Sequence, residues 1–182
     1  VLDGDRFRLD VDAIRSVVDD RTKLIVVNSP SNPTGWVINE AEQRALWELA
    51  VEHDILLVSD EVYERIVFDR DVAPSFSRIA TDREHLLLIN SFSKTYNMTG
   101  WRLGYALGHE KLVELMAKVV EFIISSPPAM IQQAGIAALR KGEDHVRRMQ
   151  EQYMARRDLV LAKLSGMPRL TGPRPDGAFY VF

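Results

Sequence analysis

The sequence predicts an α/β fold: a mostly parallel, three-layer sheet, followed by the beginning of a small α+β domain. Two observations support this prediction. In the first 110 or so residues, apolar runs of strand length show no alternation with polar residues, and helical patterns separate them. Such strands are typical of a sheet that helices cover on both faces. After about residue 110 the pattern becomes helical, and a short apolar run ends the chain.

The expected strands are short, rich in Leu, Ile and Val, and bounded by turn residues. We place them at residues 24–27, 55–58, 86–89 and 102–107. Between the first two, Asn39 is followed three residues later by Glu42, which is the spacing of a helix capping box. Ala45, Leu46 and Leu49 then repeat at helical spacing, so we expect a helix that begins after Asn39.

The second half of the chain predicts helices and a change of domain. One helix runs from about residue 110 to a break at 125–128, and two more are expected at 129–139 and 145–164. After a proline-containing loop at 166–177, the apolar run 178–182 would be the first strand of a second domain. We therefore expect residues 1–150 to belong to a large domain and residues 151–182 to begin a smaller one. Because Val1 is not a start methionine and Phe182 ends an apolar run, we expect a fragment of a longer protein.

Composition argues against several classes of protein. The 182 residues are 46% hydrophobic and 27% charged, which is the balance of a globular chain. The 23 basic and 26 acidic residues give a net charge of -3, so we expect no nucleic acid and no membrane as partner. The chain has 0 Cys, which excludes disulfides, thiolate metal sites and a cysteine nucleophile. A cytoplasmic location fits this composition.

Functional residues are expected where the parallel strands end, because open α/β sheets bind ligands beyond the carboxyl ends of their strands. That rule selects three segments, at residues 28–35, 59–63 and 90–102.

The third segment contains Lys94 directly after a buried strand, among hydroxyl side chains. Burial disfavours the ammonium form of lysine, and a neutral amine is a nucleophile that forms Schiff bases with carbonyl groups. Ser91, Ser93 and Arg102 are residue types that bind phosphate oxygens. A reactive lysine beside a phosphate site is the arrangement that the aldehyde of pyridoxal 5'-phosphate requires.

The other two segments supply polar groups that suit the same cofactor. Asp60 ends an apolar strand, where a carboxylate needs a partner, and a protonated pyridine nitrogen would be a suitable one. Tyr63 follows three residues later, with a phenol that can reach the same ligand. Asn32 lies in a loop between Pro30 and Pro33 and can hydrogen-bond the ring hydroxyl of the cofactor.

Each residue also has an ordinary structural interpretation. A lysine after a strand is usually solvated, Asp60 can cap a helix, and Tyr63 can fill the edge of a core. Residues 32–35 can form a simple turn, and Arg102 can stack on Trp101 at the surface. The occurrence of all of them at three successive strand ends favours the functional interpretation.

These segments resemble the class I/II (fold type I) pyridoxal-phosphate aminotransferases. The matching motifs are Asn32-Pro33-Thr34-Gly35, Ser59-Asp60-Glu61-Val62-Tyr63, Ser91-Phe92-Ser93-Lys94 and Gly100-Trp101-Arg102-Leu103-Gly104-Tyr105. Their order and spacing agree as well, and the resemblance extends from the strand at residue 24 to residue 180.

The resemblance implies a role for each residue. Lys94 would form the Schiff base with pyridoxal phosphate and move the proton between the substrate carbon and the cofactor. Asp60 would pair with the pyridine nitrogen, while Tyr63 and Asn32 would hydrogen-bond the ring oxygen. The whole protein would transfer the amino group of an α-amino acid to a 2-oxo acid in a ping-pong reaction.

The resemblance also assigns the phosphate group and the partners. Ser91 and Arg102 would hold the phosphate, with Ser93 as a weaker candidate for the same role. The ring-stacking aromatic and the arginine that binds the substrate carboxylate would lie outside these 182 residues. The family resemblance further implies a homodimer with the site at the subunit boundary.

Other functions use the same anchor residues and stay open at the level of sequence. One is a pyridoxal-phosphate β-lyase that acts on a sulfur amino acid. Another is a ligand-sensing module of a transcription regulator. A third is an inactive fragment, whose exposed apolar faces would cause aggregation.

Overall fold

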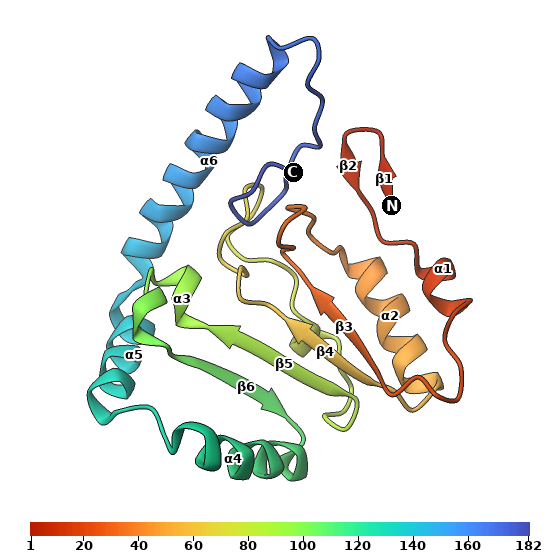
Figure 1. Cartoon of the computed structure of the whole chain (residues 1–182), viewed down its shortest axis with the longest axis vertical. Helices are drawn as coiled ribbons and strands as arrows, with labels where there is room; N and C mark the ends of the chain where they lie inside the picture. The colour runs from red at the N-terminus through yellow and green to blue at the C-terminus, as the bar shows by residue number, and fades with distance from the viewer.

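The computed structural model describes all 182 residues and contains one four-stranded mixed sheet. Its strands are β3 (Leu24–Asn28), β4 (Leu56–Asp60), β5 (Leu86–Ser91) and β6 (Gly104–Gly108), and they lie side by side in that order (Figure 1). The β3–β4 and β4–β5 pairs are parallel, whereas β6 runs antiparallel to β5. The predicted α/β class with a mostly parallel sheet is confirmed.

The register of the strands brings the strand ends that carry the expected site residues to one edge of the sheet. Asn28 of β3 pairs with Asp60 of β4, and Asp60 in turn pairs with Ile89 of β5. Ser91, the last residue of β5, lies opposite Gly104, the first residue of β6. The three segments that the sequence selected therefore follow neighbouring strands at the same edge.

Helix α2 (Glu40–Glu52) packs on one face of this sheet. It begins with the expected capping box, because the Asn39 side chain accepts from the backbone N–H of Glu42 while the Glu42 carboxylate accepts from that of Asn39. The main core lies between the helix and the sheet and is formed by Val27, Ile38, Leu46, Trp47, Ala50, Leu57, Phe76 and Leu86. On the opposite face of β3, Val26 is 63% exposed.

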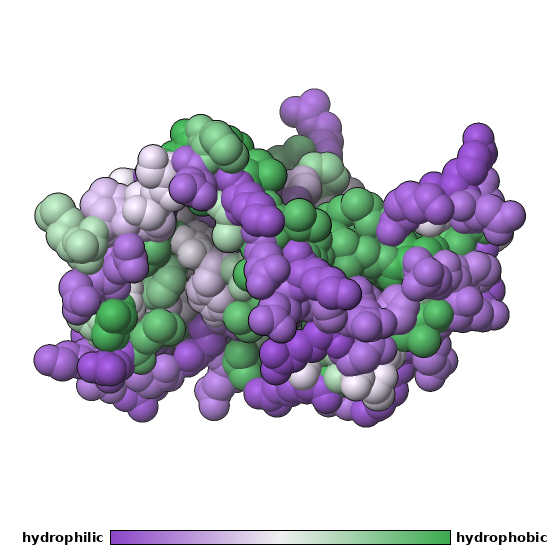
Figure 2. Space-filling view, turned by 90° about the horizontal axis from the view of Figure 1, so that it is seen from below, coloured by the Kyte–Doolittle hydropathy of each residue, from purple (hydrophilic) through white to green (hydrophobic).

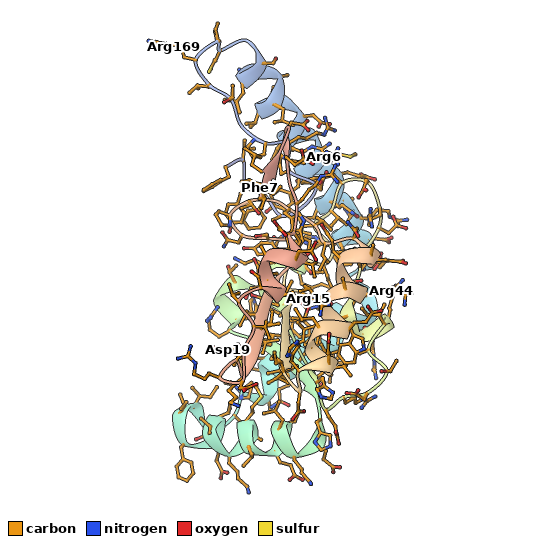
Figure 3. The ribbon with its side chains drawn as sticks, turned by 90° about the vertical axis from the view of Figure 1, so that its right-hand side faces the viewer. Arg6, Phe7, Arg15, Asp19, Arg44 and Arg169 are labelled. Atoms are coloured by element: carbon orange, nitrogen blue, oxygen red, sulfur yellow. The ribbon has the colours of Figure 1, made fainter.

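Three short elements before β3 were not expected from the sequence. They are β1 (Leu2–Asp3), β2 (Arg6–Phe7) and helix α1 (Val11–Arg15). The β1–β2 hairpin contacts the last residues of the chain, since Arg6 forms an ion pair with Asp176 at 2.9 Å and the Phe7 and Phe182 ring centroids are 6.2 Å apart. Figure 3 labels Arg6 and Phe7 on this hairpin.

Three of the remaining helices agree with the predicted boundaries to within about two residues, whereas the short helix α3 was not predicted. Helix α3 (Phe92–Thr95) follows β5 directly, and 3-10 turns occupy Phe76–Arg78 and Thr99–Trp101. Helices α4 (Glu110–Ile124), α5 (Ala129–Lys141) and α6 (Glu143–Ser165) then form the rest of the ordered elements. No helix is both long and apolar enough to span a bilayer.

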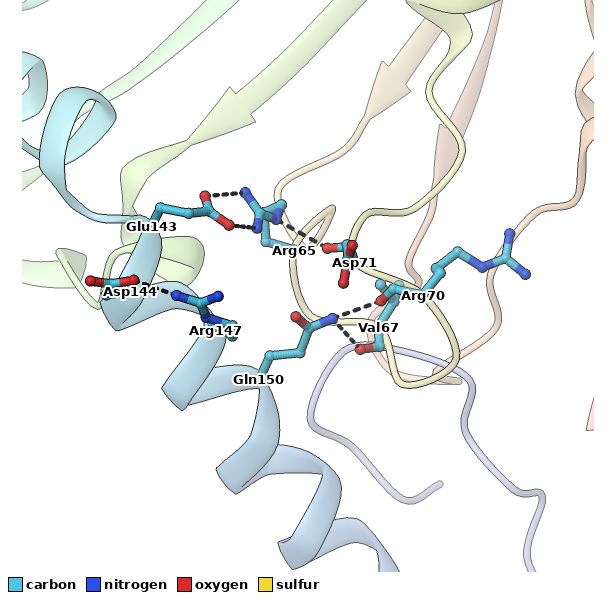
Figure 4. Close-up of polar contacts among 8 residues, drawn as sticks. All are labelled: Arg65, Val67, Arg70, Asp71, Glu143, Asp144, Arg147 and Gln150. Atoms are coloured by element: carbon cyan, nitrogen blue, oxygen red, sulfur yellow. Dashed lines mark hydrogen bonds and ion pairs between the residues drawn. The ribbon is translucent and has the colours of Figure 1, made fainter.

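Helix α6 runs without interruption through residue 150, and its first half is tied to the loop that follows Tyr63 (Figure 4). Glu143 accepts two hydrogen bonds from Arg65, at 3.0 and 2.5 Å. Two turns further on, the Gln150 side chain donates to the backbone carbonyls of Val67 and Arg70. Side chains of the helix and of the loop therefore both help to fix the N-terminal half of α6.

The expected strand at 178–182 is wrong for this structure. The segment forms no strand, and only the neighbouring Gly177 makes an isolated bridge, to Val67. A strand needs a continuous neighbour for its backbone hydrogen bonds, and only Val67 bridges to this part of the chain. The apolar side chains of the segment are instead used in an aromatic cluster described below.

Several apolar residues lie on the surface rather than in the core. Helix α4 carries a predicted apolar stripe but has no buried residue, and Phe122, Ile123 and Leu115 are 91%, 72% and 59% exposed. Figure 2, which views the molecule from the side of α4, shows hydrophobic residues gathered between hydrophilic ones on that face. The exposed apolar surface of α4 therefore bears on whether the protein binds a second protein chain.

Candidate active site

Lys94 is held by a short helix whose start is fixed on both sides. The Ser91 hydroxyl caps α3 by accepting from the backbone N–H of Ser93 at 3.1 Å, and it donates to the Leu103 carbonyl at 3.3 Å. The backbone N–H of Phe92 donates to the same carbonyl at 3.1 Å. Phe92 is buried and anchors the helix, so the backbone of Lys94 is firmly placed at the end of β5.

The amine of Lys94 lies among aromatic rings. Its Nζ is 5.5 Å from the ring centroid of Tyr63 and 5.6 Å from that of Phe179. Tyr63 is only 2% exposed, whereas Phe179 is partly open to solvent. The two rings meet edge to face at 5.3 Å, so one side of the lysine faces a fixed aromatic wall.

The phenol of Tyr63 hydrogen-bonds to that of Tyr180, with 2.8 Å between the two oxygens. Burial raises the pKa of Tyr63 well above its usual value, and the bond to Tyr180 and the nearby Asp60 charge raise it further. The Asn32 side chain acts in the opposite direction on the same pKa, which places it next to the phenol. Tyr63 is therefore a neutral hydrogen-bonding group over the whole physiological range.

Asp60 ends β4 with one carboxylate oxygen engaged locally, because its Oδ1 accepts from the backbone N–H of Val62 at 3.2 Å. Its backbone carbonyl accepts from Ser29 and from the side chain of Asn28. Asp60 Oδ2 has no protein partner, so it can accept a hydrogen bond from a ligand.

Asn32 is exposed and lies on a loop with two cis peptide bonds, at Ser29–Pro30 and Asn32–Pro33. Its backbone N–H donates to Asn28 Oδ1 at 2.7 Å, which connects the loop to the end of β3. Gly35 closes the turn with a φ of 70°, and its carbonyl accepts from the backbone N–H groups of Asp176 and Gly177. The loop is thus held between β3 and the last segment of the chain.

Arg102 adopts the left-handed conformation, with φ 53° and ψ 47°. Its guanidinium is exposed and donates to the Thr99 carbonyl at 2.9 Å. The neighbouring residue Leu103 is bonded to Ser91, so the Arg102 backbone lies close to the start of α3. No direct bond joins the Arg102 side chain to Ser91, Ser93 or Lys94 in this structure.

The structure therefore brings some of the expected residues together and leaves others at the rim. Tyr63 connects three of them, since the Lys94 amine lies 5.5 Å from its ring centroid and both Asn32 and Asp60 act on the pKa of its phenol. Ser91 caps the helix that contains Ser93 and Lys94, and the Arg102 side chain is exposed. A cavity of about 170 Å³ borders the site, because Phe179 and Tyr180 are among the residues that line it.

Sequence reasoning missed three residues that shape this site. Tyr180 and Phe179 reach Tyr63 and Lys94 from the end of the chain, and Asn28 connects the Asn32 loop to Asp60. In the sequence, Phe179 and Tyr180 are visible only as part of the apolar run 178–182, and a short apolar run of this kind predicts a strand. Asn28 was detectable as a polar residue that ends a buried strand.

Comparison with known proteins agrees with this geometry. The family model "Aminotransferase class I and II" matches residues 1–182. The chain is 36% identical over its whole length to an aspartate aminotransferase of Bacillus subtilis, of which it covers 46%. It is 42% identical to an aspartate/prephenate aminotransferase of Thermus thermophilus over 94% of the chain and 44% of that protein.

Solved structures share the fold as well as the sequence. The N-succinyldiaminopimelate aminotransferase of Mycobacterium tuberculosis superposes with a TM-score of 0.92 at 32% identity, over 98% of this chain and 46% of that one. A Thermus thermophilus aspartate aminotransferase with maleate superposes with a TM-score of 0.89 at 42% identity, over 95% of this chain and 45% of that one. The chain spans about half the length of these relatives. It belongs to the class I and II aminotransferase family.

Proposed function

We propose that the whole protein is an aminotransferase that moves the amino group of an α-amino acid to a 2-oxo acid, with Lys94 as the catalytic residue. The observation that carries this proposal is the position of the Lys94 amine, 5.5 Å from the centroid of the buried Tyr63 ring, at the sheet edge where Asp60 and Ser91 end their strands. Because several matched relatives are named aspartate aminotransferases, aspartate is the first amino donor to assay.

The residues at this edge fit pyridoxal phosphate, the cofactor of the family. Its aldehyde needs a primary amine, which Lys94 provides. Its pyridine nitrogen needs an acidic partner, and Asp60 Oδ2 has no partner within the protein. Its ring oxygen and its phosphate need donors, for which Tyr63, Asn32, Ser91, Ser93 and Arg102 are available.

When bound, pyridoxal phosphate supplies an electron sink for the negative charge that develops on the substrate carbon. The side chains of this chain perform the other tasks. Lys94 carries the covalent attachment and, as a free amine, takes and returns the α-proton. Tyr63 keeps its proton because its pKa is raised by burial, so it donates a hydrogen bond rather than carrying a charge. The carboxylate of Asp60 favours a protonated ring nitrogen.

The test is covalent trapping on Lys94 in the natural full-length protein. Borohydride reduction in the presence of pyridoxal phosphate should fix the cofactor on Lys94, as read by peptide mass spectrometry. Lys94→Ala should lose both the adduct and the turnover of aspartate with 2-oxoglutarate. Lys111→Ala, which removes an exposed lysine at the start of α4, is the matched control and should retain both.

Either a normal turnover in Lys94→Ala or an adduct on a different lysine would refute the assignment. Product analysis adds a second criterion, because a β-lyase would release a 2-oxo acid and ammonia from cystathionine without needing an oxo-acid acceptor.

We also propose a homodimer, a cytoplasmic location and a division of the chain at about residue 150. The dimer is supported by the exposed apolar residues of α4. The location is supported by the composition, because a chain with 0 Cys fits a reducing compartment. The division is supported by the hydrogen bonds from α6 to the 65–70 loop, which come from residues 143–150, while the later contact of Arg157 with the Phe68 ring, at 4.3 Å, is not a hydrogen bond.

A further inference from the structure

A hollow of about 260 Å³ lies between helix α6 and the loop that follows α3. One wall is a single face of α6, whose lining residues stand three, four, seven, eight and eleven positions after His145, and the other wall is Asn97. The lining consists of Asn97, His145, Arg148, Met149, Gln152, Tyr153 and Arg156. It contains amide, imidazole, phenol and guanidinium groups but no carboxylate.

The two arginines of this hollow have no counter-ion in the protein. Arg148 and Arg156 form no ion pair and no hydrogen bond to another protein residue, although Arg156 lies over the Tyr153 ring at 5.6 Å. The acidic side chains at this end of α6 are engaged elsewhere, Glu143 with Arg65 and Asp144 with Arg147. The two arginines of the lining therefore carry positive charges that form no ion pair with a carboxylate of the chain.

The walls are connected to each other and to the Lys94 helix. Asn97 Nδ2 is 3.1 Å from His145 Nε2, which joins the loop to α6. The backbone N–H of Asn97, a residue with φ 55°, donates to the Lys94 carbonyl at 3.3 Å. On the other side, Tyr153 stacks on Phe179 with 5.3 Å between ring centroids. The hollow is therefore separated from the lysine by this aromatic pair and is a distinct place on the molecule.

We propose that this hollow is a binding site for a small dianionic oxyanion, of the phosphate or dicarboxylate class. Guanidinium groups bind such oxygens with charge-assisted hydrogen bonds, and the side chains of Gln152 and Asn97 can donate to the remaining oxygens. The volume accommodates several non-hydrogen atoms, since one water occupies about 30 Å³ in the liquid. Two arginines select a doubly charged ligand over chloride.

The test is equilibrium dialysis of radiolabelled inorganic phosphate against the full-length protein, at constant ionic strength set with potassium chloride. The protein is first loaded with pyridoxal phosphate and the unbound cofactor is removed, so that the site around Ser91 and Arg102 is filled while no free phosphate ester competes for the hollow. Removing both arginines, as Arg148→Gln with Arg156→Gln, should weaken phosphate binding by about a hundredfold, at about tenfold for each charge-assisted contact. Succinate added as a competitor shows whether dicarboxylates share the hollow.

Two control variants separate this proposal from simpler explanations. Arg147→Gln removes the same charge from the same helix at a residue already paired with Asp144, and it should leave phosphate binding unchanged. Arg102→Gln should also leave it unchanged, even if cofactor binding is lost, because Arg102 does not line the hollow. Circular dichroism verifies that each variant is folded.

Phosphate binding that survives the double substitution, or that falls equally in Arg147→Gln, would overturn the proposal. The first result would place phosphate elsewhere, and the second would show only a response to net charge. A loss confined to Arg102→Gln would assign the anion to the cofactor site and would equally exclude the hollow.

Discussion

At the scale of single residues, Glu61 shows how closely the core approaches the sheet edge that carries the proposed site. It follows Asp60 directly, yet it is 2% exposed and its Oε1 accepts from the Ser59 hydroxyl at 2.9 Å and from the backbone N–H of Phe76 at 3.0 Å. Burial raises the pKa of Glu61 above its ordinary value of 4.5, and these hydrogen bonds only partly oppose that effect. Glu61, which follows the proposed partner of the pyridine nitrogen, is therefore an acidic residue with a structural role.

The raised pKa of Glu61 predicts a pH dependence of stability. The folded chain retains a proton on Glu61 at pH values where the unfolded chain, with a pKa near 4.5, has released it. Stability is therefore highest below that value and falls as pH rises through the raised pKa. Glu61→Gln should remove this part of the decline, as measured by urea unfolding at about pH 5 and about pH 8.

An exposed glutamate provides the control for this prediction. Glu151→Gln, on the open surface of α6, should keep the pH dependence of the unmodified protein. An unchanged slope in Glu61→Gln would show that Glu61 is ionised in the folded state at all the pH values tested.

Residue types at strand ends could be predicted from the sequence, but their long-range partners could not. Lys94, Asp60 and Tyr63 stand out because each follows a buried strand in a fixed pattern. The Tyr63–Tyr180 bond joins residues 117 positions apart, and no local pattern marks such a pair. Arg102 was expected to begin a strand, but its left-handed conformation delays β6 to Gly104.

At the scale of elements, the turn at Gly35 controls the contact between the Asn32 loop and the end of the chain. Its φ of 70° is unfavourable for any residue with a side chain, and a Cβ built there would lie 2.3 Å from Pro175 Cβ and 3.0 Å from Pro175 Cα. Glycine is thus required both by the backbone conformation and by the close packing of Pro175.

Gly35→Ala should therefore lower the free energy of unfolding by about 2 kcal/mol, because steric overlap is added to backbone strain. Urea denaturation measures this difference. Gly4→Ala is a matched control, since Gly4 has a similar φ of 64° but no atom within 4 Å of the added Cβ. It should cost only about 1 kcal/mol from strain. Equal losses in the two variants would show that the Pro175 contact relaxes freely.

Elements with a strong local signal were predictable, and those defined by distant contacts were not. The capping box at Asn39 and Glu42 fixes the start of α2 from four residues of sequence. The β1–β2 hairpin has only two residues in each strand and depends on contacts with residues 174–182, so nothing local announces it. Residues 178–182 were predicted as a strand for the same reason, because their apolar sequence does not indicate the distant contacts that their side chains make.

At the scale of the whole molecule, the apolar face of α4 is the main surface without cover. Phe122 is 91% exposed at the end of a helix that has no buried residue. If α4 lies in the proposed homodimer interface, Phe122→Glu should raise the dimer dissociation constant by about tenfold or more, because burying a Phe side chain contributes about 2 kcal/mol. Sedimentation equilibrium of the full-length protein measures this constant.

Val17→Glu is the control, because Val17 is a comparably exposed apolar residue, at 75%, beyond the end of α1. It should leave the dimer unchanged. A dissociation constant that is the same in Phe122→Glu and in the unmodified protein would place the interface elsewhere.

The long helix α6 has a mechanical consequence of its own. Its 23 residues make a rod of about 35 Å, fastened at Glu143 and Gln150 near one end. Arg157 also lies over the Phe68 ring at 4.3 Å, so contacts with the 65–70 loop recur every seven residues from Glu143 to Arg157. Only the last eight residues of the helix, about 12 Å of its length, extend beyond these contacts. Tyr153, which stacks on Phe179 beside Lys94, therefore stands in the fastened part of the rod, where bending of the tip moves it little.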